Sequence, residues 1–147
     1  MAESPAPKPI DPRGPRFNQA MIAALLLVGF VLDWGPIVPV VAVVLALGAA
    51  LGPRFGPFLA LYAHVIRPRL GPPAELEDPR PPRFAATLGA VVLTASTVAF
   101  LADAEVLGWA LALLVALLAG LAASTGICVG CEIYLFLARR RGVRMAG

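Results

Sequence analysis

Two cysteines, Cys128 and Cys131, are the residues of this chain whose types and spacing point most directly to a chemistry. In the string Cys128-Val129-Gly130-Cys131 both sulfurs fall on one helical turn, within disulfide reach of each other. A thiol in such a motif can have a pKa well below its usual value of about 8.5, especially at the amino terminus of a helix. Gly126 can end one helix and leave Cys128 at the start of the next. The spacing therefore favours thiol–disulfide redox chemistry, with Cys128 as the more reactive thiol and Cys131 as the resolving one.

Four other residues are candidates for tuning or assisting the cysteines. Glu132 directly follows the pair, where its charge opposes a thiolate although its carboxylate can accept a proton. Arg54 lies in a matching break in the first half of the chain, and its positive charge would favour a thiolate at Cys128. His64, the single histidine, and Tyr134 are the remaining candidate binding residues. The ordinary role for His64 is that of a polar residue at the level of the lipid headgroups.

Two other roles for the cysteines stay open at this point. Cysteine is a small apolar residue, so the pair can simply pack inside a helical bundle. A metal site needs more ligands than two thiolates, and His64 and Glu132 are the only obvious additions. No nucleotide-binding loop, nucleophile triad or zinc-protease helix appears, and no cofactor is evident. Because two cysteines alone cannot relay electrons across a membrane, a redox role requires a thioredoxin-like partner, a quinone or a second membrane subunit.

The rest of the chain has the composition of a membrane protein. Of its 147 residues 59% are hydrophobic and 14% are charged, and the mean hydropathy is +0.83. The charges are segregated, since residues 17–32, 35–52, 84–102 and 106–131 carry none. A helix that crosses a bilayer needs about 20 mostly apolar residues. The four runs therefore predict an all-α integral membrane protein with four transmembrane helices in contact with the lipid bilayer.

The positive charges lie on one side of these four runs. When the amino terminus is placed in the cytoplasm, all 12 Lys and Arg fall on the cytoplasmic side, and Asp33, Asp103 and Glu105 fall on the other. This bias predicts that both termini are cytoplasmic. Since the arginines lie at the ends of spans, they set the topology and do not form a groove for nucleic acid. Trp34 and Trp109, at the outer ends of spans, are expected in the aromatic belt at the interface.

A seven-residue motif occurs twice along the chain. Residues 11–17, Asp-Pro-Arg-Gly-Pro-Arg-Phe, recur as residues 78–84, Asp-Pro-Arg-Pro-Pro-Arg-Phe. Each copy opens an apolar run, where Asp can cap a helix and Pro suits the next position. Each copy continues as span, acidic turn, span, and then a short apolar segment that ends in arginine. We therefore predict two parallel-repeat helical hairpins, repeat one (11–69) and repeat two (78–141), with short interfacial helices on the cytoplasmic side.

A break near Gly126 decides how deep the cysteines lie. A single helix over 106–139 would be about 50 Å long, which is too long for one span without strong tilt. We therefore expect the span to end near Gly126, with the cysteines at the cytoplasmic boundary and the next segment along the interface. In the first half the equivalent break covers 52–57, and aligning the tyrosines that precede the closing arginines puts Gly56 opposite Cys128.

The chain is expected to form one membrane domain, residues 10–141. A disordered cytoplasmic tail (1–9) precedes it, and a second cytoplasmic tail (142–147) follows it. Four short helices make a thin bundle, so association with other copies or with a partner is expected. If the cysteines are structural or bind a metal, the alternative function is a non-catalytic subunit of a membrane complex or a small-solute permease.

Three strings in the chain resemble one bacterial membrane family. They are Asp11-Pro12-Arg13…Arg16-Phe17-Asn18-Gln19, Arg83-Phe84-Ala85…Gly89 and Gly126-Ile127-Cys128-Val129-Gly130-Cys131-Glu132-Ile133-Tyr134. Together they are similar to the family called domain of unknown function 4395, over about residues 10–134. The resemblance implies a small multi-pass protein of the bacterial inner membrane, and it implies no established reaction. The cysteine pair of that family maps onto Cys128 and Cys131, with no catalytic role attached.

Overall fold

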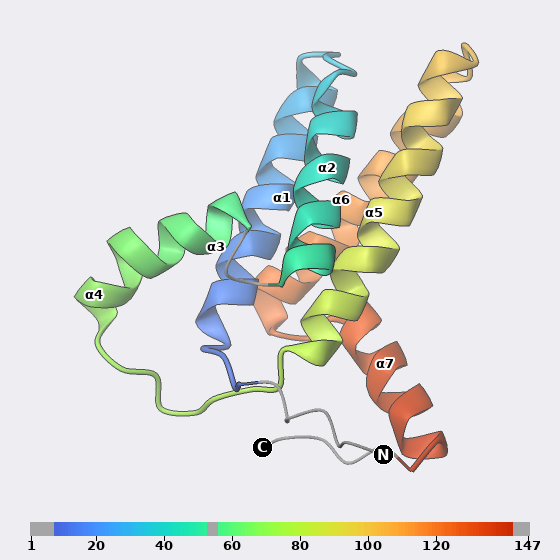
Figure 1. Cartoon of the computed structure of the whole chain (residues 1–147). Helices are drawn as coiled ribbons and strands as arrows, with labels where there is room; N and C mark the ends of the chain where they lie inside the picture. The colour runs from blue at the N-terminus through green and yellow to red at the C-terminus, as the bar shows by residue number, and fades with distance from the viewer. Residues whose placement is uncertain (1–7, 53–55, 143–147) are drawn as a thin grey trace.

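In the computed structural model, which describes residues 8–52 and 56–142, these residues form helices, the connections between them and one isolated β-bridge. The long helices are α1 (Arg13–Val31), α2 (Ile37–Leu51), α5 (Arg80–Leu101) and α6 (Glu105–Thr125). The shorter elements are α3 (Pro57–Leu61), the π-helical turn η2 (Tyr62–Ile66), α4 (Arg67–Leu70) and α7 (Val129–Arg140). Figure 1 shows a bundle of the long helices, from which the α3–α4 stretch and α7 diverge on opposite sides.

Three of the helices are long and apolar enough to cross a membrane, namely α1 with 19 residues, α5 with 22 and α6 with 21. The chain is therefore an all-α multi-pass membrane protein. The helix α2 is apolar but has 15 residues, and at about 1.5 Å per residue it is roughly 22 Å long, short of the roughly 30 Å core of a bilayer. It is shorter than the uncharged run 35–52 because Pro36 precedes its first turn and Gly52, with φ 94°, ends it.

The first hairpin packs face to face against the second. The helix α1 lies against α6, α2 lies against α5, and α5 also contacts α6. Branched side chains that are 0% exposed fill the space between α1, α2 and α5: Ile22, Leu26, Val38, Val41 and Leu93. Buried alanines of α6 complete this core: Ala112, Ala116 and Ala119. Because lipid provides no hydrophobic drive between helices, small residues that permit close packing supply much of the contact energy.

Trp109 lies in the core and not in the interfacial belt that its position predicts. Its side chain is 8% exposed, and its ring meets Phe30 and Phe100 edge-on, with centroid distances of 5.4 and 5.1 Å. Gly108 permits this arrangement, since a Cβ there would lie 2.8 Å from the Phe100 ring. Trp34 is 52% exposed and keeps the surface position expected of an interfacial residue.

The starts of the two motif copies contact each other directly. Ile10 and Glu77, the residues that precede the copies, form an antiparallel bridge in which each N–H donates to the other's carbonyl at 2.8 Å. Within each copy the aspartate accepts the backbone N–H of the arginine two residues later, at 2.9 Å for Arg13 and 2.8 Å for Arg80. The same aspartates also pair with these guanidinium groups. The short polar motif thus fixes where α1 and α5 begin.

The second arginine of each copy reaches the end of a helix in the other hairpin. Arg16 donates to the carbonyl of Ala123 near the end of α6, at 3.2 Å. Arg83 donates through two nitrogens to the carbonyl of Ala49 near the end of α2, at 3.1 and 2.9 Å. The last carbonyls of a helix lack partners within the helix and carry partial negative charge, so guanidinium groups are favourable there. These contacts tie the two hairpins together at the end that carries the cysteines.

Candidate redox site

Cys128 lies at the start of α7, immediately after a sharp break. The helix α6 ends at Thr125, and Gly126 has φ 78°, in the left-handed region that favours glycine. Cys128 has extended backbone (φ −96°, ψ 114°), and its Sγ accepts the backbone N–H of Cys131 at 3.4 Å. The break predicted near Gly126 is therefore confirmed, and the long single helix over 106–139 is wrong.

Gly56 holds the matching place in the first half of the chain. It has extended backbone (φ −72°, ψ 130°) directly before Pro57, the first residue of α3. Both halves therefore break after a long helix and restart with an extended residue, but only the second half carries sulfur there. Arg54, which was expected to act from this break, lies outside the described residues.

Both cysteines are half-buried free thiols. A hydrogen bond from the Cys131 side chain lowers the pKa of Cys128 to about 6; burial and Glu132 oppose this, and the N–H groups of Cys131 and Gly130 assist it. The same side-chain bond raises the pKa of Cys131, and burial and the charges of Cys128, Glu77 and Glu132 add to this. The pKa of Cys128 therefore lies below that of Cys131, so Cys128 is the thiol of the pair that ionises first.

Gly130 lets α7 approach α5 closely. A Cβ at this position would lie 2.8 Å from the Cβ and 2.9 Å from the Cα of Ala85 on α5. The Cα belongs to the backbone of a long helix, so it cannot move aside as a flexible side chain would. The glycine between the cysteines therefore sets the distance between the cysteine motif and the bundle.

Replacing Gly130 by alanine is expected to lower the stability of the bundle by about 1–3 kcal/mol, the usual cost of overpacking. The substitution must push α7 away from α5, so it should also change the alkylation rate of Cys128. Gly48→Ala on α2 is the matched control, because a Cβ there meets no atom within 4 Å. Unfolding in detergent mixtures with rising SDS measures both variants. Equal stabilities for Gly130→Ala and Gly48→Ala would contradict the close approach.

The other candidate site residues that the structure describes are His64, Tyr134 and Glu132, and each lies in a different environment. His64 is exposed on η2, with its Nδ1 2.8 Å from the carbonyl oxygen of Ala60, and η2 packs on α1 whereas α7 packs on α5. The Tyr134 ring packs on Phe84, with centroids 5.5 Å apart. Glu132 is exposed and acts on the thiols through its charge. Within 8–52 and 56–142 no three His, Cys, Asp or Glu side chains gather as a metal site would need.

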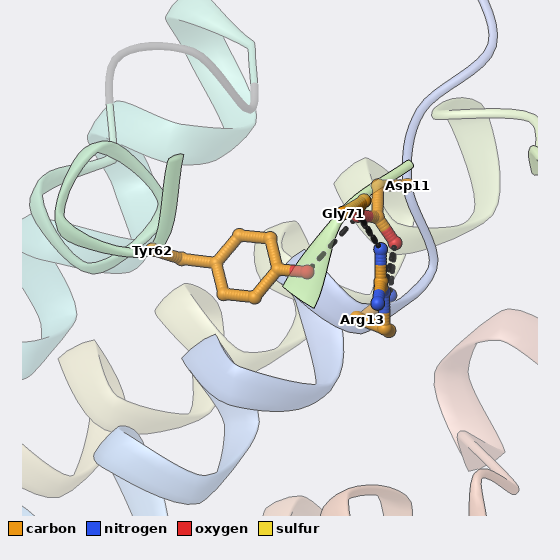
Figure 2. Close-up of polar contacts among 4 residues, drawn as sticks. All are labelled: Asp11, Arg13, Tyr62 and Gly71. Carbon is orange, nitrogen blue, oxygen red and sulfur yellow. Dashed lines mark hydrogen bonds and ion pairs between the residues drawn. The ribbon is translucent and has the colours of Figure 1, made fainter. Parts of the chain in front are cut away.

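A polar cluster around Asp11 was not predicted from the sequence. The Asp11 carboxylate accepts the hydroxyl of Tyr62 at 2.9 Å and Nε of Arg13 at 3.2 Å. Arg13 also donates to the carbonyl of Gly71 at 3.0 Å, so Asp11 and Arg13 together link the start of α1 to η2 and to the end of α4 (Figure 2). Phe17 packs on the Tyr62 ring, with centroids 5.9 Å apart. We call Asp11, Arg13 and Tyr62 the Asp11 clamp.

A cavity of about 170 Å³ lies among the four long helices, and Cys128 forms part of its wall. Most of the lining is apolar, and the polar side chains in it are Asn18 and Gln19 of α1 and Arg83 of α5. This cavity could not be predicted from the sequence, because the pattern of apolar residues does not say which faces of α1 and α5 meet. The cavity and the Cys128 sulfur together make up the candidate site.

Comparison with known proteins identifies the family. The family model described as "Domain of unknown function (DUF4395)" matches residues 10–139, which include both motif copies and both cysteines. Searches of curated proteins and of solved structures returned no match to the chain. The chain therefore belongs to the DUF4395 family, as its three characteristic strings suggest.

Proposed function

We propose that this chain is a membrane thiol–disulfide protein whose redox pair is Cys128 and Cys131. The main support for this proposal is the position of the Cys128 sulfur. It lies at the amino terminus of α7 and accepts a hydrogen bond from the backbone N–H of Cys131 at 3.4 Å. Free N–H groups and the helix dipole favour negative charge at such a place. Because both thiols lie on the same first turn, a disulfide can close between them without rearranging the bundle.

The proposed exchange proceeds through a mixed disulfide. The Cys128 thiolate attacks one sulfur of a partner disulfide, forms a bond to it and releases the partner's other sulfur as a thiolate. Cys131 then loses its proton and attacks the Cys128 sulfur, which releases the partner's second thiolate and closes the internal disulfide. The chain loses two electrons, and the partner gains them and two protons. The reverse sequence reduces the chain, and a thioredoxin-like dithiol is a partner of the required chemistry.

The membrane arrangement that we propose has four spans in two parallel-repeat hairpins. Matched contacts support the repeat: Phe17 packs on Tyr62 as Phe84 packs on Tyr134, and the second arginine of each motif reaches the opposite hairpin. We count the short helix α2 as the fourth span because it runs alongside α5 within the bundle. Local thinning of the bilayer can accommodate its length at modest cost. Interfacial helices, α3–α4 and α7, would then lie on the side of the arginines.

The proposed location is the bacterial inner membrane, with both termini in the cytoplasm. Arg13, Arg16, Arg80 and Arg83 lie at the beginnings of α1 and α5, where the two hairpins enter the bundle. Asp33, Asp103 and Glu105 lie in or beside the short α1–α2 and α5–α6 connections. Both connections lie at the opposite end of the bundle (Figure 1). The positive-inside rule then places the cysteines on the cytoplasmic side.

Redox titration of the purified protein tests the function. In glutathione buffers of graded ratio, we expect the pair to pass from dithiol to disulfide as one two-electron step. Cys131→Ser should trap a mixed disulfide on Cys128, whereas Cys128→Ser should trap far less, because the remaining thiol has a raised pKa. A pair that stays reduced in every buffer would refute the redox role. A membrane-impermeant maleimide, applied to intact cells and to inverted vesicles, reports the side on which the thiols lie.

A further inference from the structure

The cavity beside Cys128 has the size and lining of a site for one aromatic-sized ring. Its volume is about 170 Å³, and an apolar cavity of about 150 Å³ holds a benzene ring. Ile22, Leu45, Val92 and Val115 are among its apolar lining residues. Small-molecule sites are typically apolar, with a few polar groups that orient the ligand.

The polar groups of this cavity are distributed unequally between the two halves of the chain. When the motif copies are aligned, Asn18 and Gln19 of α1 stand opposite Ala85 and Ala86 of α5, and all four line the cavity. Within the described part of the chain, neither amide side chain makes a hydrogen bond. The sulfur is also unmatched, since Gly56 stands where Cys128 would be repeated. One wall therefore offers amide N–H donors and another offers the Cys128 sulfur, an arrangement suited to a single oriented ligand.

We infer that this cavity binds the ring of a lipid-soluble quinone, which accepts the electrons of the Cys128–Cys131 dithiol; the inference rests on the proposed function. Quinone carbonyl oxygens are hydrogen-bond acceptors that match the NH₂ groups of Asn18 and Gln19. A quinone is apolar enough to reach a partly open cavity among the helices of a membrane protein, and its isoprenoid tail would remain in lipid. Arg83 is already bound to α2 carbonyls and serves as part of the wall.

Electrons and protons balance between the Cys128–Cys131 dithiol and the quinone. The Cys128 thiolate forms a sulfur–carbon bond to the quinone ring. Cys131 then loses its proton and attacks the Cys128 sulfur, so the disulfide closes, the sulfur–carbon bond breaks and its electron pair passes into the ring. The dithiol loses two electrons and two protons, and the quinone takes them up as its two carbonyls become hydroxyls. A thioredoxin-like dithiol would regenerate the reduced pair by exchange. Electrons would thus pass from a cytoplasmic dithiol to the quinone pool.

The test uses the full chain, reduced and reconstituted in lipid nanodiscs, with duroquinone as the probe. The four ring carbons of duroquinone that are not carbonyls all carry methyl groups, so a thiol is not consumed by a stable adduct. We expect one quinol to appear for each pair of thiols lost. Asn18→Leu with Gln19→Leu should slow this reaction about tenfold or more. Thr94→Leu on the exposed face of α5 is the control, and the pH profile of Cys128 alkylation shows whether each variant retains its fold.

Three outcomes would overturn the quinone site. If oxidised glutathione oxidises the pair but duroquinone leaves both thiols free, the inference fails and the proposed function stands. If neither oxidant acts, both fail. If duroquinone oxidises the wild type and the double leucine variant equally fast, the quinone reacts elsewhere and the cavity is not its site.

Discussion

Alkylation of Cys128 in the reduced protein is expected to follow a titration with its midpoint near pH 6, where the wild-type thiol has its lowered pKa of about 6. An ordinary thiol has a pKa of about 8.5 and is only about 3% ionised at pH 7, whereas a thiol with a pKa of about 6 is about 90% ionised. Since only the thiolate reacts, the labelled fraction should rise with pH through this midpoint. Mass spectrometry after short pulses of iodoacetamide measures it separately for each cysteine. Cys131 should remain unlabelled across the same range, because its pKa is raised.

Two substitutions at Cys131 separate the causes of the low midpoint. The Cys131 side chain is the largest influence that lowers the pKa of Cys128, ahead of the backbone N–H groups. Cys131→Ala removes this donor and should move the midpoint upward by at least about one unit, which is a tenfold loss of thiolate. Cys131→Ser keeps a donor and should move it less. Identical midpoints in the wild type and in both variants would show that Cys131 does not stabilise the thiolate.

Local features of the fold were predictable because they depend on residues close together in the chain. Gly126 can adopt a positive φ at little cost, so a glycine between an apolar run and a new amphipathic segment indicates a helix end. The starts of α1 and α5 are similarly local, since each aspartate binds the N–H two residues later. The length of α2 was overestimated because uncharged residues outside the helix, Pro36 and Gly52, were counted with the span.

The candidate site was predictable only where it is local. Cys128 and Cys131 are three residues apart, so helix geometry alone brings them together. Tyr62 and Asp11 are 51 residues apart, and their hydrogen bond depends on how η2 packs on α1. The influence of Glu77 on Cys131 likewise arises from the fold, and so does the lining of the cavity. Trp109 was assigned to the surface because the sequence indicates how far along the span it lies, but not which face of the helix it occupies.

Removal of the Asp11 carboxylate is expected to release the α3–α4 stretch from the bundle. Asp11→Ala leaves the buried Tyr62 hydroxyl without its acceptor and Arg13 without its ion partner. Breaking such a hydrogen-bonded charge should cost about 2–3 kcal/mol, which corresponds to a rise of roughly 30- to 150-fold in local opening. Cleavage by trypsin after the exposed Arg69 measures this opening. Glu105→Ala, which removes an equal charge from an exposed site, should leave the cleavage rate unchanged.

The same clamp should weaken in acid, and the direction follows from the pKa of Asp11. Burial raises this pKa, but the hydrogen bonds from Arg13 and Tyr62 outweigh burial and bring it below the ordinary value of 3.8. A carboxyl group with a lowered folded-state pKa stabilises the fold above its ordinary pKa and loses that contribution as the pH falls through the folded value. Chemical labelling of the α3–α4 stretch should therefore increase below about pH 4 in the wild type. Asp11→Asn cannot titrate and should show no such step, and a step of equal size in that variant would assign the acid response to a different carboxylate.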